Sequence, residues 1–136
     1  MIGMSNTPQT GTYDVVVNST SGWTMSFGLT VSPPVTQTLT LGTPQSVSIS
    51  HPGQFAQLGF TAAAGQNLNV SISSFATSPG GQTATFQVLG PSGNQIAGTT
   101  VSSNANLMLN NLSAGACTVM IYPWYASMAT FQAEVQ

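Results

Sequence analysis

The chain contains no lysine and no arginine, and only Asp14 and Glu134 among its 136 residues carry a formal charge. Because phosphate neutralisation requires cationic side chains, this composition excludes nucleic-acid binding. The net charge of −2 also provides little repulsion between copies of the chain. These absences favour a structural or interaction module over an enzyme.

Groups that could catalyse a reaction or bind a metal are equally scarce. The chain has one histidine, His51, and one cysteine, Cys117, which are too few donors for a metal site of four protein ligands. Asp14 and Glu134 are the only carboxylate pair for glycoside cleavage, and the pattern predicts that both face solvent. We therefore expect no catalytic residues, no metal and no cofactor.

The lone histidine and the lone cysteine each allow two interpretations. His51 begins a His-Pro-Gly reversal, where an exposed turn residue and a pH-sensitive contact are the alternatives. Cys117 shares a strand face with Val119 and Ile121, which favours a small buried side chain over a reactive thiol. No disulfide can form within the chain, so cysteine usage does not indicate a redox compartment.

Long apolar runs are missing as well. No stretch approaches the roughly 18 apolar residues that span a bilayer. Residues 1–9 also lack the basic region followed by an apolar one that marks an export signal. We expect no membrane insertion, and any export signal has been removed or lies outside this chain.

Short alternating groups of apolar residues are present throughout, separated by turn residues. Such alternation predicts half-buried β-strands, and their spacing of about ten residues is typical of a β-sandwich. The residues Gly90 to Gly93 have the proline and glycine positions of a type I turn. The predicted strands contain Leu39 and Leu41; Val47 and Ile49; Ala56, Leu58 and Phe60; Leu68, Val70 and Ile72; Phe86 and Val88; Leu107 and Leu109; Val119 and Ile121; and Phe131, Ala133 and Val135.

Two prolines, Pro33 and Pro34, mark a boundary, and the segments on either side of it contain a repeat. Residues 11–32 align without a gap on residues 115–136, an offset of 115 − 11 = 104, with four identities in 22 positions. A true repeat and a strand pattern without shared ancestry both fit this alignment. The repeat predicts two units: residues 1–32, a hairpin equivalent to the last two strands of a repeat, and residues 33–136, a complete sandwich.

The predicted N-terminal hairpin would present an apolar face and unpaired strand edges. We expect that face to contact a neighbouring subunit, although packing within the same chain is the alternative. The candidate contact residues are Tyr13, Val15, Val17, Phe27, Leu29 and Val31.

The run from Pro8 to Val17 resembles the closing strand of bacterial pre-peptidase C-terminal-like repeats, with their Pro-x-Thr-Gly-x-Tyr pattern. Residues 112–121 resemble a second copy, in which Cys117 replaces the usual tyrosine. The resemblance implies an all-β fold, an antiparallel β-sandwich of jelly-roll type, here with an extra N-terminal β-hairpin. It also implies a non-catalytic module of secreted or cell-surface proteins. Some relatives bind calcium, but two carboxylates supply too few ligands.

A sheet with no lysine at its edges is prone to self-association. The predicted function is therefore a non-catalytic structural subunit of an extracellular or cell-surface bacterial filament or fibre, whose partner is another copy of itself. The alternative is a carbohydrate-binding or spacer module of a larger surface protein. Its candidate glycan-binding patch is formed by Tyr122, Trp124 and Tyr125, which core capping or a subunit contact would also explain.

Overall fold

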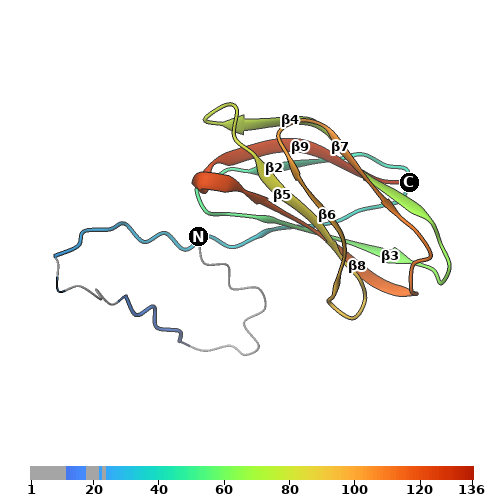
Figure 1. The fold of residues 1–136 in the computed structure, drawn as a ribbon, viewed down its shortest axis with the longest axis horizontal. Coiled ribbons are helices and arrows are strands. Elements are labelled where there is room, and N and C mark those ends of the chain that lie inside the picture. Colours follow the sequence, from blue (N-terminus) through green and yellow to red (C-terminus); the bar gives the residue numbers. More distant parts are fainter. Residues whose placement is uncertain (1–11, 18–21, 23) are drawn as a thin grey trace.

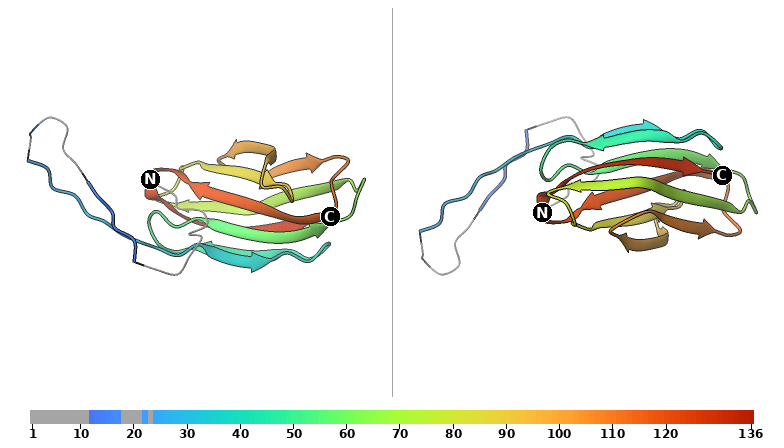
Figure 2. Two further views of the ribbon diagram at one scale, coloured as in Figure 1. Left: turned by 90° about the horizontal axis from the view of Figure 1, so that it is seen from below. Right: turned by 90° about the horizontal axis from the view of Figure 1, so that it is seen from above.

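Two β-sheets packed face to face form a sandwich, seen edge-on in Figure 2. The computed structural model describes residues 12–17, 22 and 24–136. The elements are β1 (Val35–Thr38), β2 (Gln45–Ile49), β3 (Ala56–Ala62), β4 (Leu68–Ser78), β5 (Ala84–Leu89), β6 (Gln95–Val101), β7 (Ala105–Leu109), β8 (Gly115–Pro123), the 3-10 turn η1 (Trp124–Ala126) and β9 (Met128–Val135). The predicted all-β sandwich is confirmed.

The chain crosses between the sheets repeatedly. One sheet has the strand order β1-β3-β8-β5-β6 and the other the order β2-β9-β4-β7. The strand neighbours are antiparallel except for β1 and β3, which run in parallel. That parallel pair differs from the expected antiparallel pattern. It arises because β2, the strand between them in sequence, lies in the opposite sheet and reverses the chain direction.

The apolar alternation places the core between the sheets, as the period of two requires. Leu58 in β3 and Phe86 in β5 have no exposed surface, and Val70 in β4 is equally buried from the opposite sheet. The turn predicted at residues 90–93 is present, with the amide of Gly93 donating to the carbonyl of Gly90 at 2.9 Å. Burying each large aliphatic side chain stabilises the fold by about 1.5–3 kcal/mol.

The first predicted strand lies earlier in the sequence than the alternation of Leu39 and Leu41 indicated. β1 ends at Thr38, and Leu41 makes only an isolated bridge to Val135. Leu39 is buried, whereas Leu41 is exposed. The reversal toward β2, where the Gly42 amide donates to the Val135 carbonyl, ends the strand before the second leucine.

The N-terminal segment, defined here as residues 12–17, 22 and 24–34, extends away from one end of the sandwich (Figures 1 and 2). None of its described residues belongs to a strand, so the predicted N-terminal hairpin is absent from the described part of the chain. A two-stranded unit is only marginally stable without a surface on which to pack its apolar face.

The repeat also implied a hairpin over residues 115–136, the segment that matches the N-terminal one, and this prediction is wrong. β8 pairs with β3 and β5, whereas β9 pairs with β2 and β4 in the opposite sheet. The two strands therefore face each other across the core instead of sharing hydrogen bonds. η1 connects them because it turns the chain from one layer to the other.

Candidate interaction surfaces

The N-terminal segment carries exposed apolar side chains at every second residue. Tyr13, Val15 and Val17 are about half exposed, and Phe27 and Val31 are 59% and 76% exposed. Leu29, the remaining predicted contact residue, is exposed as well. All six predicted contact residues are thus accessible in this structure.

The matching positions in β8 and β9 form the centre of the core. Offset by 104 positions, the counterparts of the six contact residues are each at most 3% exposed. They are Cys117, Val119 and Ile121 in β8, and Phe131, Ala133 and Val135 in β9. The same spacing of apolar residues therefore lies inside the sandwich in one segment and in solvent in the other.

The place where the N-terminal segment leaves the sandwich is fixed by a buried glutamine. The side-chain amide of Gln54 donates to the Pro33 carbonyl at 2.9 Å, while its oxygen accepts from the Ser50 amide at 3.1 Å. The Val35 amide then donates to the Phe55 carbonyl at 2.9 Å. Gln54 is 8% exposed, so burying its amide costs little only because both ends are satisfied. These hydrogen bonds fix the position at which the N-terminal segment joins the sandwich.

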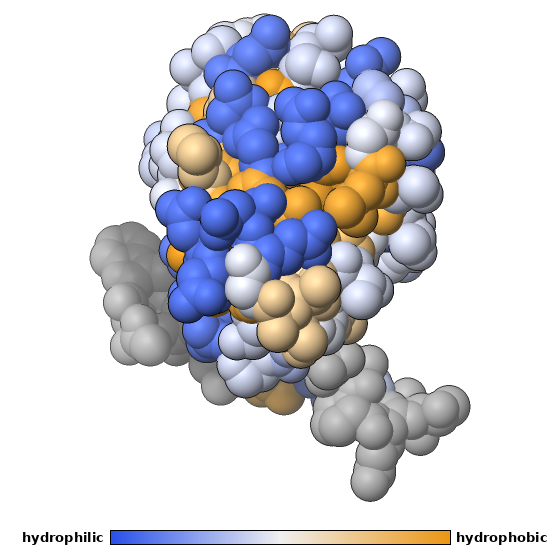
Figure 3. Space-filling model, turned by 90° about the vertical axis from the view of Figure 1, so that its right-hand side faces the viewer, coloured by the Kyte–Doolittle hydropathy of each residue, from blue (hydrophilic) through white to orange (hydrophobic). Residues whose placement is uncertain are grey.

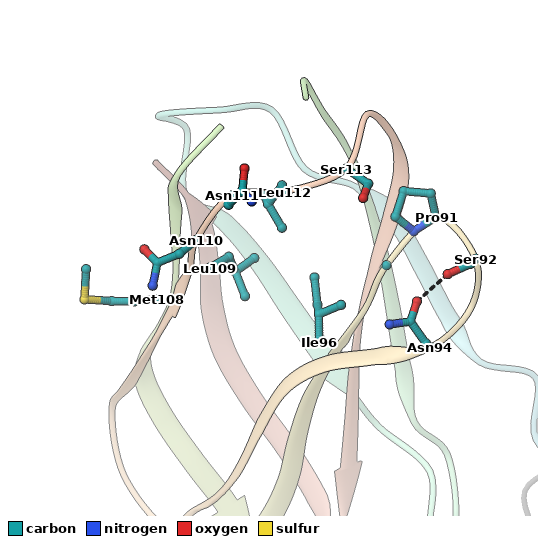
Figure 4. A pocket seen from close by; sticks show the side chains of 11 residues that line it. Pro91, Ser92, Asn94, Ile96, Met108, Leu109, Asn110, Asn111, Leu112 and Ser113 are labelled. Atoms are coloured by element: carbon teal, nitrogen blue, oxygen red, sulfur yellow. Dashed lines mark hydrogen bonds between the residues drawn. The ribbon is translucent and has the colours of Figure 1, made fainter. Parts of the chain in front are cut away.

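A groove lies at the opposite end of the sandwich, between the start of β6 and the end of β7 (Figure 4). It encloses about 530 Å³. Its apolar lining includes Ile96, Met108, Leu109 and Leu112, and its rim carries polar residues such as Asn94. Figure 3 looks onto this end of the molecule and shows apolar side chains between polar ones.

Hydrogen bonds between the surrounding loops hold the groove open. The Leu112 amide donates to the Gln66 carbonyl at 3.0 Å, and the Asn111 amide donates to the Asn67 side-chain oxygen at 2.8 Å. On the other wall, the hydroxyl of Ser92 donates to the side-chain oxygen of Asn94. Such bonds restrict the loops, so the groove is preformed.

One wall of the groove requires a glycine. A Cβ atom on Gly115, whose φ is +138°, would lie 2.9 Å from Cβ of Pro91. The start of β8 can therefore approach the 90–94 turn only without a side chain. Alanine here would displace Pro91, which lines the groove.

The aromatic residues singled out from the sequence lie at the other end, near the origin of the N-terminal segment. Trp124 is 43% exposed and Tyr125 is 83% exposed, with their rings edge to face at 6.1 Å. The Trp124 indole N–H donates to Thr85 Oγ1 at 2.9 Å, which fixes the indole ring. Tyr125 and Ala126 both adopt left-handed φ angles, of 53° and 55°. This backbone is strained for residues with side chains.

Tyr122 does not share the exposure of the other two aromatic residues. Its ring stacks on Phe55 with the centroids 5.0 Å apart, and burial raises the pKa of its phenol. Trp124 and Tyr125 therefore make up the exposed aromatic surface.

The few titratable groups are dispersed. Asp14 is exposed in the N-terminal segment, and Glu134 is half-buried in β9 opposite Ser71. His51 is exposed in the β2–β3 turn with its Nδ1 3.0 Å from Ser50 Oγ. Cys117 is buried, and that burial raises the pKa of its thiol. Among the described residues, no three His, Cys, Asp or Glu side chains lie close enough to hold a metal ion.

The described part of the chain contains no helix that is long and apolar enough to cross a membrane.

The groove was not predicted from the sequence. The proline turn at 90–93 implied that a strand follows it, but no apolar alternation located that strand at residues 95–101. Ile96 was the available signal, since it follows the turn directly and lines the groove.

Solved structures that share this fold include the following two. The pre-peptidase C-terminal domain of collagenase from Bacillus anthracis superposes with a TM-score of 0.54 at 16% identity, covering 79% of this chain and 100% of that domain. PliG from Aeromonas hydrophila, a periplasmic inhibitor of g-type lysozyme, superposes with a TM-score of 0.52 at 16% identity, covering 76% and 97%.

The chain thus has the fold of a pre-peptidase C-terminal domain, as the sequence resemblance implied. No protein-family model matches the sequence, and neither does any curated protein. The likeness is therefore one of fold, in a small β domain.

Proposed function

We propose that this chain is a non-catalytic structural subunit of an extracellular bacterial filament or fibre that assembles through β-strand contacts. The observation that supports this function is the exposed apolar alternation of the N-terminal segment, which matches the buried alternation of β8 and β9. Such a surface costs free energy in water and is stabilised by a partner. The partner we infer is another copy, because the apolar spacing of the segment is that of two core strands of this same sandwich. The chain also has no lysine or arginine with which to bind an acidic or nucleic-acid surface.

The two ends of the molecule carry different surfaces, which fits an open assembly. The register of β1 with β3, and of β3 with β8, places Val35 beside the end of β8. The groove lies beside the beginning of β8, so it and the N-terminal segment lie at opposite ends (Figure 1). Contacts between different surfaces repeat without closing when no rotation brings the ends together. A filament is the expected product.

The test is deletion of residues 1–32. The sandwich from β1 to β9 contains the whole buried core, so the shortened chain should keep its β-sheet circular dichroism spectrum and unfold cooperatively. It should remain monomeric where the full chain forms fibres in electron micrographs. Fibres that persist unchanged after this deletion would exclude strand donation by the segment.

A carbohydrate-binding or spacer module is the second candidate function. Trp124 and Tyr125 support it because an exposed aromatic pair on a strained turn, with one ring fixed by Thr85, offers a flat apolar surface. A glycan array with the full chain should then show binding that Tyr125→Ala and Trp124→Ala both abolish. Tyr122→Phe is the control, since Tyr122 stacks on Phe55 and is not part of the exposed pair. No glycan bound by the unaltered chain would reject this candidate.

A further inference from the structure

The two sides of the sandwich differ in how well their edge strands are protected. β1 and β2 form the edges on one side, and β6 and β7 form the edges on the other. β1 has four residues and follows Pro33 and Pro34, which cannot donate a backbone hydrogen bond. The side chain of Gln37 in β1 also donates to the Ser46 carbonyl in β2 at 3.2 Å. On this side β1 is therefore short, and a side-chain hydrogen bond links the two sheets.

The other side has a longer edge strand in the five-stranded sheet. β6 has seven residues against four in β1, β7 and β2 have five each, and neither β6 nor β7 contains a proline or a charged residue. β6 bulges only at its beginning, where the register shifts opposite Val88 and Leu89, and pairs regularly with β5 afterwards. An edge of this kind is a template for pairing with a further strand.

The interior of the sandwich is accessible along this side. Thr99 in β6 stands opposite Phe86 of β5, so both side chains point between the sheets. Phe86 is completely buried, whereas Thr99 is exposed. Beside it, Ala97 of β6 and Leu107 of β7 are only partly buried against the core. A strand added to either edge could therefore extend the core outward with inward-facing apolar residues.

We propose that the side formed by β6 and β7, with the groove between their ends, is the acceptor site for the N-terminal segment of a second copy. Residues 12–17 add to β6, and residues 24–31 add to β7. This assignment follows β8 and β9, the matching strands, which lie one in each sheet and face each other across the core. Apolar side chains of the donor continue the core, and one of them enters the groove. The proposal deepens the proposed function and depends on it.

The distribution of charge also favours the N-terminal segment as the strand that binds this edge. A donor strand with a charged inward face would have to desolvate that charge at this edge. The positions of the segment that correspond to inward-facing ones carry only tyrosine, valine, methionine, phenylalanine and leucine, and its one carboxylate, Asp14, falls on the other face. The acceptor strands contain no charge to oppose it.

The test compares one substitution on the two sides of the full-length chain. Thr99→Lys places a cation on the inner face of the β6 edge, and Thr38→Lys places one on the outer face of the β1 edge as the control for added charge. Both threonines are exposed, so both variants should fold, which circular dichroism checks. Sedimentation velocity over a concentration series should show association weakened at least about tenfold by Thr99→Lys, or about 1.4 kcal/mol, and nearly unchanged by Thr38→Lys.

The possible outcomes separate the acceptor site from the proposed function. Association that is weakened by Thr38→Lys and not by Thr99→Lys overturns the acceptor site while self-assembly stands. Equal weakening by both variants overturns it too, since the effect is then one of net charge. An unaltered chain that stays monomeric at all concentrations overturns both proposals.

A cross-linking measurement covers the case in which Thr99→Lys fails to fold. One full-length chain carries Val16→Cys in the segment, and a second carries Thr100→Cys in β6 or, as control, Thr36→Cys in β1. With a short bismaleimide, the mixture with Thr100→Cys should give several-fold more mixed dimer than the control mixture. Equal or greater cross-linking to Thr36→Cys contradicts the acceptor site.

Discussion

Phe27 and Phe131 occupy matching positions in two segments with the same apolar spacing, yet Phe27 is 59% exposed and Phe131 is 3% exposed. Phe131 lies in β9, hydrogen-bonded between β2 and β4 and facing the opposite sheet. Phe27 lies in the N-terminal segment, which extends away from the sandwich on the N-terminal side of Pro33. The alternation thus determines which side chains share a face. Neighbouring strands determine whether that face is buried.

The largest expected effect separates these two phenylalanines. Phe131→Ala should lower the free energy of unfolding by about 3–5 kcal/mol, because it leaves a cavity between the sheets. Phe27→Ala should change it by less than about 0.5 kcal/mol in the monomer, because Phe27 does not contribute to the core. Urea unfolding at a concentration where the chain is monomeric measures both. Similar losses for the two variants would mean that the segment packs on its own sandwich.

Thiol reactivity gives the second contrast. In Val15→Cys, the new thiol should react with a maleimide at least about a hundredfold faster than Cys117, which can react only when the core opens. Burial also raises the pKa of Cys117, so little of its reactive thiolate is present at neutral pH. Labelling followed by mass spectrometry should show one fast and one slow site. The unaltered chain is the control, and fast labelling of it would contradict the burial of β8.

The pH dependence of stability should be the smallest effect and should come from the sandwich alone. Burial raises the pKa of both Cys117 and Tyr122 in the folded state. The folded protein therefore retains protons that the unfolded chain releases, and stability falls as the pH rises above about 9. Chemical unfolding between pH 7 and 11 should show a plateau and then this decline. Deleting residues 1–32 should not change the profile, and stability that rises with pH would contradict the assignment.

The alternation predicted most of the sandwich because each of those strands buries one face. Leu58 and Phe60 in β3, or Val119 and Ile121 in β8, point inward at every second position. β6 was missed because an edge strand with a bulge buries little, and its inward Thr99 is polar and exposed. Alternation alone contains no information on such a strand.

The repeat suggested contact residues in the N-terminal segment as a hypothesis, but it could not indicate their arrangement in space. The repeat located the six exposed residues of the N-terminal segment, but the sequence placed both halves in one hairpin. β8 and β9 show that such a strand pair can lie in opposite sheets, since η1 carries the chain across the core. Local spacing does not specify which strands pair over long sequence separations. The groove depends on such pairing, because Ile96 and Leu109 come from different sheets.

Hydrogen–deuterium exchange of the full chain at low and high concentration tests most directly whether the N-terminal segment becomes core in another copy. We expect the amides of residues 12–17 and 24–31 to exchange rapidly in dilute solution. At high concentration they should become protected together with β6 and β7, while β1 and β2 keep their exchange rates. Rapid exchange of both parts of the segment at every concentration would contradict assembly through this segment.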